Sequence, residues 1–328
     1  MTAFAVLDLV PVIEGGSVGA ALAASAALAR RAEAAGYGRF WIAEHHATPG
    51  IASAATAVAL GHIGQATTTI RIGAGGIMLP NHNPFVIAEQ FGTLDALFPS
   101  RVDLGLGRAP GADARIALML RKELHAAADR FPEDVVELQA LFAGDPRLPL
   151  QATPGQGAAV EVWILGSSLF GAQLAAILGL PYAFASHFAP AALDAALALY
   201  RREFRPSERL DRPYAMAAIN VTCAPTDAEA VLLASSMDQS FVALRTGTPG
   251  RLKPPVPGYR DGLPAAARAI LDTFREVSAT GSPATVRAAL AAFIARTGAD
   301  ELIFAGATFD PEARARSLEL ALEAAEGL

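Results

Sequence analysis

The sequence predicts an α/β fold, a (β/α)8 TIM barrel with insertions, and three observations carry that prediction. Eight short apolar segments alternate with longer, alanine-rich segments along the 328 residues. Short apolar strands separated by helices indicate a parallel sheet that helices cover on both faces. Eight such units spread over the whole length favour a closed barrel over a doubly wound sheet. Because no change of composition divides the chain, we predict a single domain over residues 1–328.

Each unit has its own signals. Glycines follow two of the predicted helices, as is common at helix ends, and Pro84 falls in the first turn of another. The predicted strands are Phe4–Val10, Arg39–Ala43, Ile70–Gly75, Val102–Leu106, Val160–Leu165, Tyr182–Ala185, Tyr214–Cys223 and Glu301–Ala305. The predicted helices are Val18–Ala35, Ser53–Gln65, Pro84–Phe98, a polar helical region from about Asp113 to Phe142, Leu169–Leu178, Pro190–Phe204, Asp227–Leu244, Pro283–Thr297 and Pro311–Glu326.

One segment breaks the alternation of strands and helices. Arg245–Pro264 is so rich in proline and glycine that it cannot form a helix or a central strand. Long loops of this kind in compact domains are lids, binding loops or disordered insertions. Because the segment follows the seventh strand and its helix, it could return to the mouth of the barrel. Arg245 and Tyr259 are then candidate substrate or lid residues, and an ordinary flexible insertion is the equal alternative.

Composition excludes several classes of protein. The net charge is −6, and no cluster of Lys and Arg offers the basic face of a nucleic-acid binder. No stretch of 18 to 20 apolar residues lacks charges or breakers, so we expect no membrane span. The first residues are typical of a strand and not of a signal peptide, since Asp8 interrupts their apolar run. The single Cys223 excludes an intramolecular disulfide and suits a reducing cytoplasm, where we expect the protein.

The active site of such a barrel lies at the C-terminal ends of the strands, which makes Glu44-His45-His46 a candidate. Adjacent residues on an extended chain point to opposite sides, so one histidine should face the mouth and the other should pack outward. The two should therefore not bind one metal ion, and we expect no metal site. A histidine at the mouth could exchange protons near neutral pH. A structural pair bonded to loop carbonyls is the alternative.

Four further groups follow strand ends. The glycines of Gly73-Ala74-Gly75-Gly76, before the segment that holds His82, would let the backbone approach a flat ligand, or they form a simple turn. Arg108 suits a phosphate or carboxylate, or a structural ion pair. Gly166-Ser167-Ser168 is first of all typical of a helix N-cap, and the same geometry makes a phosphate site, which Arg108 one strand away favours. His187 would face the mouth or pack as a structural histidine. Signatures of serine hydrolases, P-loop enzymes and Rossmann dehydrogenases are absent from the sequence.

Residues 36–46, 67–111 and 162–188 together resemble the bacterial-luciferase-like family of flavin-dependent oxidoreductases, in particular its bacterial members that emit no light. The resemblance implies a TIM barrel that binds FMN at its C-terminal face. It assigns Arg108 and Ser167, with Gly166 and Ser168 beside them, to the phosphate. It places a non-proline cis peptide at Gly75-Gly76 under the flavin ring and makes His45 the catalytic histidine. Apart from the resemblance, we predict His46, His82 and His187 as substrate or lid residues.

Two departures separate this sequence from the light-emitting enzymes. Gly107 stands where they carry a reactive cysteine, and Leu169-Phe170 replaces part of their set of hydroxyl residues. These changes argue against the aldehyde reaction of the light emitters and leave the flavin site intact.

The resemblance implies an FMN-dependent monooxygenase. A separate flavin reductase would supply reduced FMN, which would react with O2 through a C4a-peroxyflavin to oxidise a small organic, apolar or aromatic substrate. The resemblance also suggests a homodimer. Two alternatives remain open: a deazaflavin-dependent hydride-transfer enzyme, and a flavin-binding partner subunit without turnover.

Overall fold

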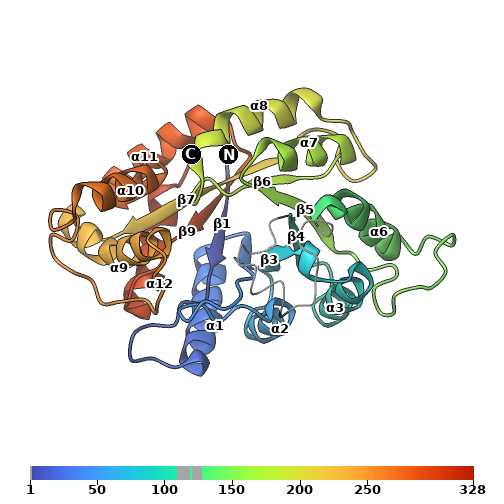
Figure 1. Cartoon of the computed structure of the whole chain (residues 1–328), viewed down its shortest axis with the longest axis horizontal. Coiled ribbons are helices and arrows are strands. Elements are labelled where there is room, and N and C mark those ends of the chain that lie inside the picture. Colours follow the sequence, from blue (N-terminus) through green and yellow to red (C-terminus); the bar gives the residue numbers. More distant parts are fainter. Residues whose placement is uncertain (1, 109–118, 120–127) are drawn as a thin grey trace.

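The computed structural model describes residues 2–108, 119 and 128–328, and it confirms the predicted barrel (Figure 1). Strands β1 to β7 pair in parallel in the order of the chain, and β9 lies between β7 and β1 and closes the barrel. The eight barrel strands are β1 (Ala3–Asp8), β2 (Arg39–Ile42), β3 (Arg71–Met78), β4 (Val102–Gly107), β5 (Glu161–Gly166), β6 (Tyr182–Phe184), β7 (Ala215–Cys223) and β9 (Glu301–Ala305).

Helices surround these strands in Figure 1 and cover the outer face of the barrel. The described helices are α1 (Val18–Ala35), α2 (Thr56–Ala66), α3 (Pro84–Leu97), α6 (Phe131–Ala143), α7 (Leu169–Leu178), α8 (Leu193–Glu203), α9 (Asp227–Arg245), α10 (Ala265–Arg275), α11 (Pro283–Thr297) and α12 (Pro311–Ala324), with short 3-10 turns at Leu79–Asn81 and Pro190–Ala192. None of them is long and apolar enough to cross a membrane. The part of the predicted region Asp113–Phe142 that precedes Ala128 lies outside the described residues, apart from Met119.

Alternation along the strands builds two separate apolar layers. Phe40 and Ile42 of β2 face outward and join the layer between strands and helices, whereas Trp41 points into the barrel. Inside, Trp41 meets Trp163 of β5 edge to face, with ring centres 5.2 Å apart. This geometry is favourable for aromatic pairs, so the two rings fill the centre of the barrel as a packed core.

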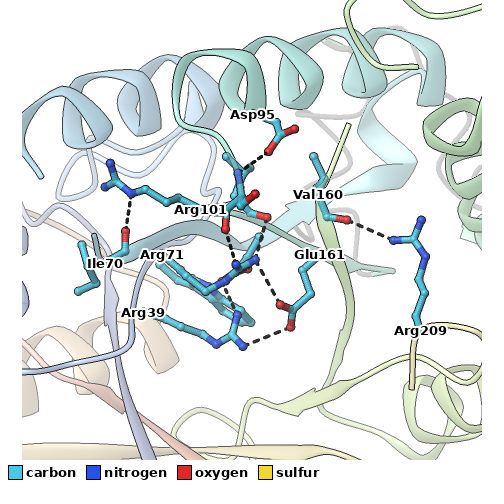
Figure 2. A network of polar contacts seen from close by, with 12 residues as sticks. Arg39, Ile70, Arg71, Asp95, Arg101, Val160, Glu161 and Arg209 are labelled. Atoms are coloured by element: carbon cyan, nitrogen blue, oxygen red, sulfur yellow. Dashed lines mark hydrogen bonds and ion pairs between the residues drawn. The ribbon is translucent and has the colours of Figure 1, made fainter. Parts of the chain in front are cut away.

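A network of charged residues occupies the N-terminal end of the barrel. Arg39 at the start of β2 forms ion pairs with Asp103 of β4, Glu161 of β5 and Glu301 of β9. Arg71 at the start of β3 pairs with Asp103 and Glu161 as well, and Figure 2 shows both arginines reaching Glu161. With one end of the barrel closed in this way, ligand sites are left to the opposite, C-terminal end.

The region after α9 is more regular than predicted. We expected no helix or strand between Leu244 and Pro283, but α10 forms there, and a ninth strand, β8 (Ser278–Gly281), pairs with the C-terminal half of β7. Phe274 of α10 stacks on Phe241 of α9 with ring centres 4.2 Å apart, so burial against α9 stabilises a helix whose own signals are weak.

Candidate active site

The two histidines after β2 point in different directions, as the alternation of side chains predicts. His45 lines a cavity of about 280 Å³ at the C-terminal end of the barrel. The His46 ring instead bonds the carboxylate of Glu44. The structure thus leaves His45 as the histidine of this pair that can reach a ligand.

The cavity wall comes from several strands and loops around the C-terminal mouth of the barrel. Contributions come from β1, from the loop after β2, from Gly75 of β3, from the segment after β6, from α9 and from the Pro/Gly-rich insertion. Its described lining residues are Leu7, Leu9, Pro11, Ala43, His45, Thr48, Gly50, Ile51, Gly75, Ala185, His187, Phe188, Met237, Ser240, Phe241, Leu244, Pro249, Gly250, Leu252, Phe274 and Ala307. A wall so dominated by apolar side chains is typical of a site for a small organic molecule.

The two histidines in this wall are held in their neutral form. Burial lowers the pKa of His45, although the charge of Glu44 opposes that shift. Burial lowers the pKa of His187 to about 4, and repulsion from His45 adds to the effect. Near pH 7 both rings are therefore neutral, so in each ring one nitrogen can donate a hydrogen bond and the other can accept one.

Glu44 belongs to the candidate group after β2, but the sequence reasoning gave it no role of its own. Its buried carboxylate accepts hydrogen bonds from His46, from His82 at 2.8 Å and from the backbone N–H of Met78 at 2.9 Å. Burial alone would raise the pKa of Glu44, but these bonds lower it below its usual value. Glu44 therefore ties the loop after β2 to the end of β3, and its 38-residue separation from His82 explains why no local motif revealed it.

Glu44, His46 and His82 are also the described residues that come nearest to a metal site, since one ligand atom of each lies within 4.8 Å of the others. Tetrahedral zinc keeps such atoms about 3.3 Å apart, because each bond is about 2.0–2.2 Å long. The His82 nitrogen lies only 2.8 Å and 3.0 Å from the two Glu44 oxygens, which is ordinary hydrogen-bond distance. Hydrogen bonding therefore accounts for this cluster.

The peptide bond between Gly75 and Gly76 is cis, at the position where the resemblance implies one. A Cβ atom on Gly76 would lie 2.5 Å from the carbonyl oxygen of Gly105, and one on Gly75 would lie 2.9 Å from Leu7 Cδ1. Only glycine fits both positions, and the Glu44 N–H holds the Gly76 carbonyl at 3.3 Å. At this backbone, Gly75 lines the cavity beside His45.

Arg108 lies next to the start of α7. Its guanidinium carbon lies 4.2 Å above the ring centre of Phe170, in the first turn of that helix. Ser168 occupies the N-cap position, but its side chain caps no backbone N–H, and both Ser167 and Ser168 are exposed. Arg108 is 42% exposed; among the described residues its Nε donates to the Ala128 carbonyl at 3.2 Å, and it forms a distant ion pair with Asp129 at 3.6 Å. Uncapped N–H groups, the helix dipole and an available arginine together suit a phosphate group.

The remaining candidates lie at the rim or away from the cavity. The Arg245 guanidinium packs over Phe188 and Phe241 and donates to the Phe188 carbonyl, outside the cavity wall. Tyr259 lines a separate hollow with Asp238 and Arg275 and does not appear among the described residues of the cavity wall.

The Pro/Gly-rich insertion does reach the mouth of the barrel. Leu252 is buried, forms a β-bridge to Ile13 and lines the cavity beside Pro249 and Gly250. In this structure the insertion therefore covers one side of the cavity.

Comparison with known proteins places this geometry in context. The model of the family described as luciferase-like monooxygenase matches residues 2–301. A luciferase-like monooxygenase of Escherichia coli (strain K12) is 49% identical over 327 residues, which cover 99% of this chain and 98% of that protein. The solved structure of apo-MsnO8 is 32% identical and superposes with a TM-score of 0.88 over 99% of this chain and 98% of that one.

Two more distant structures share the fold and differ in cofactor. The oxygenating constituent of 3,6-diketocamphane monooxygenase of Pseudomonas putida, in complex with FMN, has a TM-score of 0.72 at 18% identity, over 97% of this chain and 96% of that one. An F420-dependent secondary alcohol dehydrogenase has a TM-score of 0.74 at 16% identity, over 98% of both chains.

Proposed function

We propose that this chain, a member of the luciferase-like monooxygenase family and therefore an oxidoreductase, is an FMN-dependent monooxygenase. Its substrate would be a small apolar or aromatic molecule. The observation that carries the proposal is the division of the barrel mouth into two parts. An anion site at Arg108 and the start of α7 follows β4 and β5, whereas the apolar cavity is lined from β1, β3 and the segments after β2, β6 and β9. His45 and Gly75 belong to the cavity wall, and Gly75 lies on β3, which pairs with β4.

These residues fit FMN in charge and in shape. Arg108 with Ser167 and Ser168 would hold the phosphate, because a guanidinium and free N–H groups both favour an anion. The side-chain-free surface of Gly75-Gly76 would lie against the flat ring system. Bound reduced FMN supplies the two electrons with which O2 delivers one oxygen atom to the substrate and the other to water.

The residues of the chain would then protect and assist that chemistry. The apolar wall excludes water from the reacting groups, which suppresses wasteful release of peroxide. His45 is mainly neutral near pH 7, so its imidazole can take a proton from a reacting group and return it. Glu44 would position His45, because its N–H bonds the Gly76 carbonyl and its carboxylate bonds the ring of the next residue, His46.

Replacing Arg108 by alanine tests the phosphate site. We expect FMN binding to weaken about ten- to hundredfold, because a charge-assisted contact is lost. Riboflavin, which has no phosphate, should bind the variant and the unchanged protein equally well. Fluorescence titration of both flavins measures the difference, and equal FMN affinity in the two proteins would refute the assignment of Arg108.

Oxygen uptake distinguishes the two cofactor classes. A monooxygenase consumes one O2 for each substrate oxidised when a flavin reductase supplies reduced FMN. A deazaflavin enzyme, the alternative suggested by the shared fold of the F420-dependent dehydrogenase, transfers hydride without oxygen uptake. A flavin-binding partner without turnover would give no product under either condition.

We further propose that a separate flavin reductase supplies the reduced cofactor and that the chain forms a homodimer in the cytoplasm. Its one cysteine, Cys223, is buried and free, as suits a reducing compartment. Light scattering after size-exclusion chromatography measures the number of subunits, and a monomeric mass would contradict the dimer.

A further inference from the structure

The His187 ring is held in the cavity wall with unused hydrogen-bonding capacity. Its backbone is fixed to β7, because the Asn220 amide donates to the His187 carbonyl at 3.0 Å and the Ser186 hydroxyl donates to the Ala218 carbonyl. The Nδ1 atom of the ring is buried and has no hydrogen-bond partner among the described residues. Because Nδ1 is buried, it does not border the cavity. The nitrogen left for a ligand is Nε2, which is not among the buried atoms and has no hydrogen bond to a described residue.

The charge of the wall limits what that ligand can be. Among the described lining residues there is no Lys, Arg, Asp or Glu. A charged group that entered this cavity would lose its hydration without gaining an opposite charge, which is strongly unfavourable. The body of the ligand would meet side chains such as Leu7, Met237, Phe241 and Leu252, which favour apolar contact.

Arg245, which packs beside the cavity-lining rings of Phe188 and Phe241, is a cation that could favour an anion instead. Its guanidinium already stacks on Phe188 at 4.6 Å and donates to the Phe188 carbonyl at 2.8 Å. These contacts hold the arginine at the rim and use it to fix the aromatic rings there. The favoured ligand is therefore an uncharged one.

We propose, building on the monooxygenase function above, that the substrate is a neutral molecule with an apolar body and one uncharged hydrogen-bonding group, and that His187 binds that group. A hydroxyl can donate to the neutral imidazole, and a carbonyl can accept from it. The proposal makes His187 a specificity residue: it selects oxygen-bearing neutral molecules over plain hydrocarbons, while the uncharged wall rejects anions.

Four probes with the same eight-carbon chain test the proposal: octane, 1-octanol, 2-octanone and octanoate. Calorimetric titration of the full chain, with and without oxidised FMN, measures binding and needs no turnover. We expect the alcohol and the ketone to bind about tenfold more tightly than octane and than octanoate. In His187→Leu that advantage over octane should disappear, while octane binds as before. In His187→Asn, whose amide can donate and accept hydrogen bonds, the alcohol and the ketone should regain part of their higher affinity relative to octane.

His62→Leu is the matched control, since it makes the same chemical change in α2, away from the cavity, and should leave all four affinities unchanged. Two results would overturn the proposal. One is that octanoate binds more tightly than 1-octanol; the other is that His187→Leu weakens the affinity for all four probes equally. Because these measurements record binding alone, failure of the FMN hypothesis would appear separately, as unchanged FMN affinity in Arg108→Ala.

Discussion

At the scale of single residues, the triplet Glu44-His45-His46 illustrates what sequence can and cannot predict. Alternation along an extended chain correctly separated the directions of the two histidines. It could not say which one faces the cavity, because that depends on the path of the chain after β2. The resemblance supplied His45, and the partners of Glu44 became visible only when the fold brought His82 beside it.

Glu44→Gln tests whether Glu44 positions and tunes His45. The attraction of the Glu44 carboxylate raises the pKa of His45 against the effect of burial, so removing that charge should lower the pKa further. The acidic limb of the pH dependence of substrate oxidation should therefore move to lower pH, and kcat should fall about tenfold. Steady-state kinetics between pH 5 and pH 9 measure both changes.

Glu137→Gln provides the control, because Glu137 is exposed on α6, and it should leave the profile in place. A Glu44→Gln enzyme with reduced kcat and an unmoved profile would show that Glu44 has a structural role alone.

At the scale of elements, the eight strands were predictable because each is short, buried and apolar, and each is followed by a helix. The strand ends were less predictable: β3 extends to Met78, past the glycines at which we ended it, because Gly75-Gly76 continues the pairing with β4 through an irregularity. α10 and β8 were missed because a proline-rich segment precedes them and their stabilising contacts, with α9 and β7, are distant in sequence.

Glu33 shows how one side chain joins two elements, and it predicts a dependence of stability on pH. From the last turn of α1 its carboxylate accepts backbone N–H bonds from Thr68, Thr69 and Ile70, just before β3. Partial burial would raise its pKa, but the bonds from Ile70, Thr69 and Thr68 lower it from 4.5 to about 2. The ionised form therefore stabilises the fold fully above pH 4.5, and this contribution is lost as the pH falls towards 2.

Glu33→Gln should consequently destabilise the protein by about 1–2 kcal/mol at pH 7, because charge-assisted hydrogen bonds are replaced by weaker ones at a partly exposed position. The difference from the unchanged protein should shrink between pH 4.5 and pH 2. Urea unfolding across this range measures it. A difference that stays constant with pH would mean that the charge of Glu33 contributes nothing.

At the scale of the whole molecule, the N-terminal end of the barrel contributes to stability and the C-terminal end carries the candidate site. Ion pairs join β2, β3, β4, β5 and β9 at the N-terminal end, whereas the C-terminal end carries the cavity and the anion site. The count of eight units predicted closure of the barrel. The charge network was not predictable, because its members lie at the starts of strands up to 262 residues apart and meet only once the barrel has closed.

Asp103 is the centre of that network and provides the test of its contribution to stability. Its fully buried carboxylate accepts hydrogen bonds from Arg39 at 2.7 Å, from Arg71 Nε at 2.8 Å and from the Trp41 indole at 2.8 Å. Asp103→Asn leaves two partly buried arginines short of a counter-charge beside a fully buried position, so we expect a loss of about 3–5 kcal/mol in the free energy of unfolding. Asp194→Asn, in an exposed pair with Arg296, should cost less than about 1 kcal/mol. Urea unfolding measures both variants, and equal losses would show that barrel closure does not depend on the network.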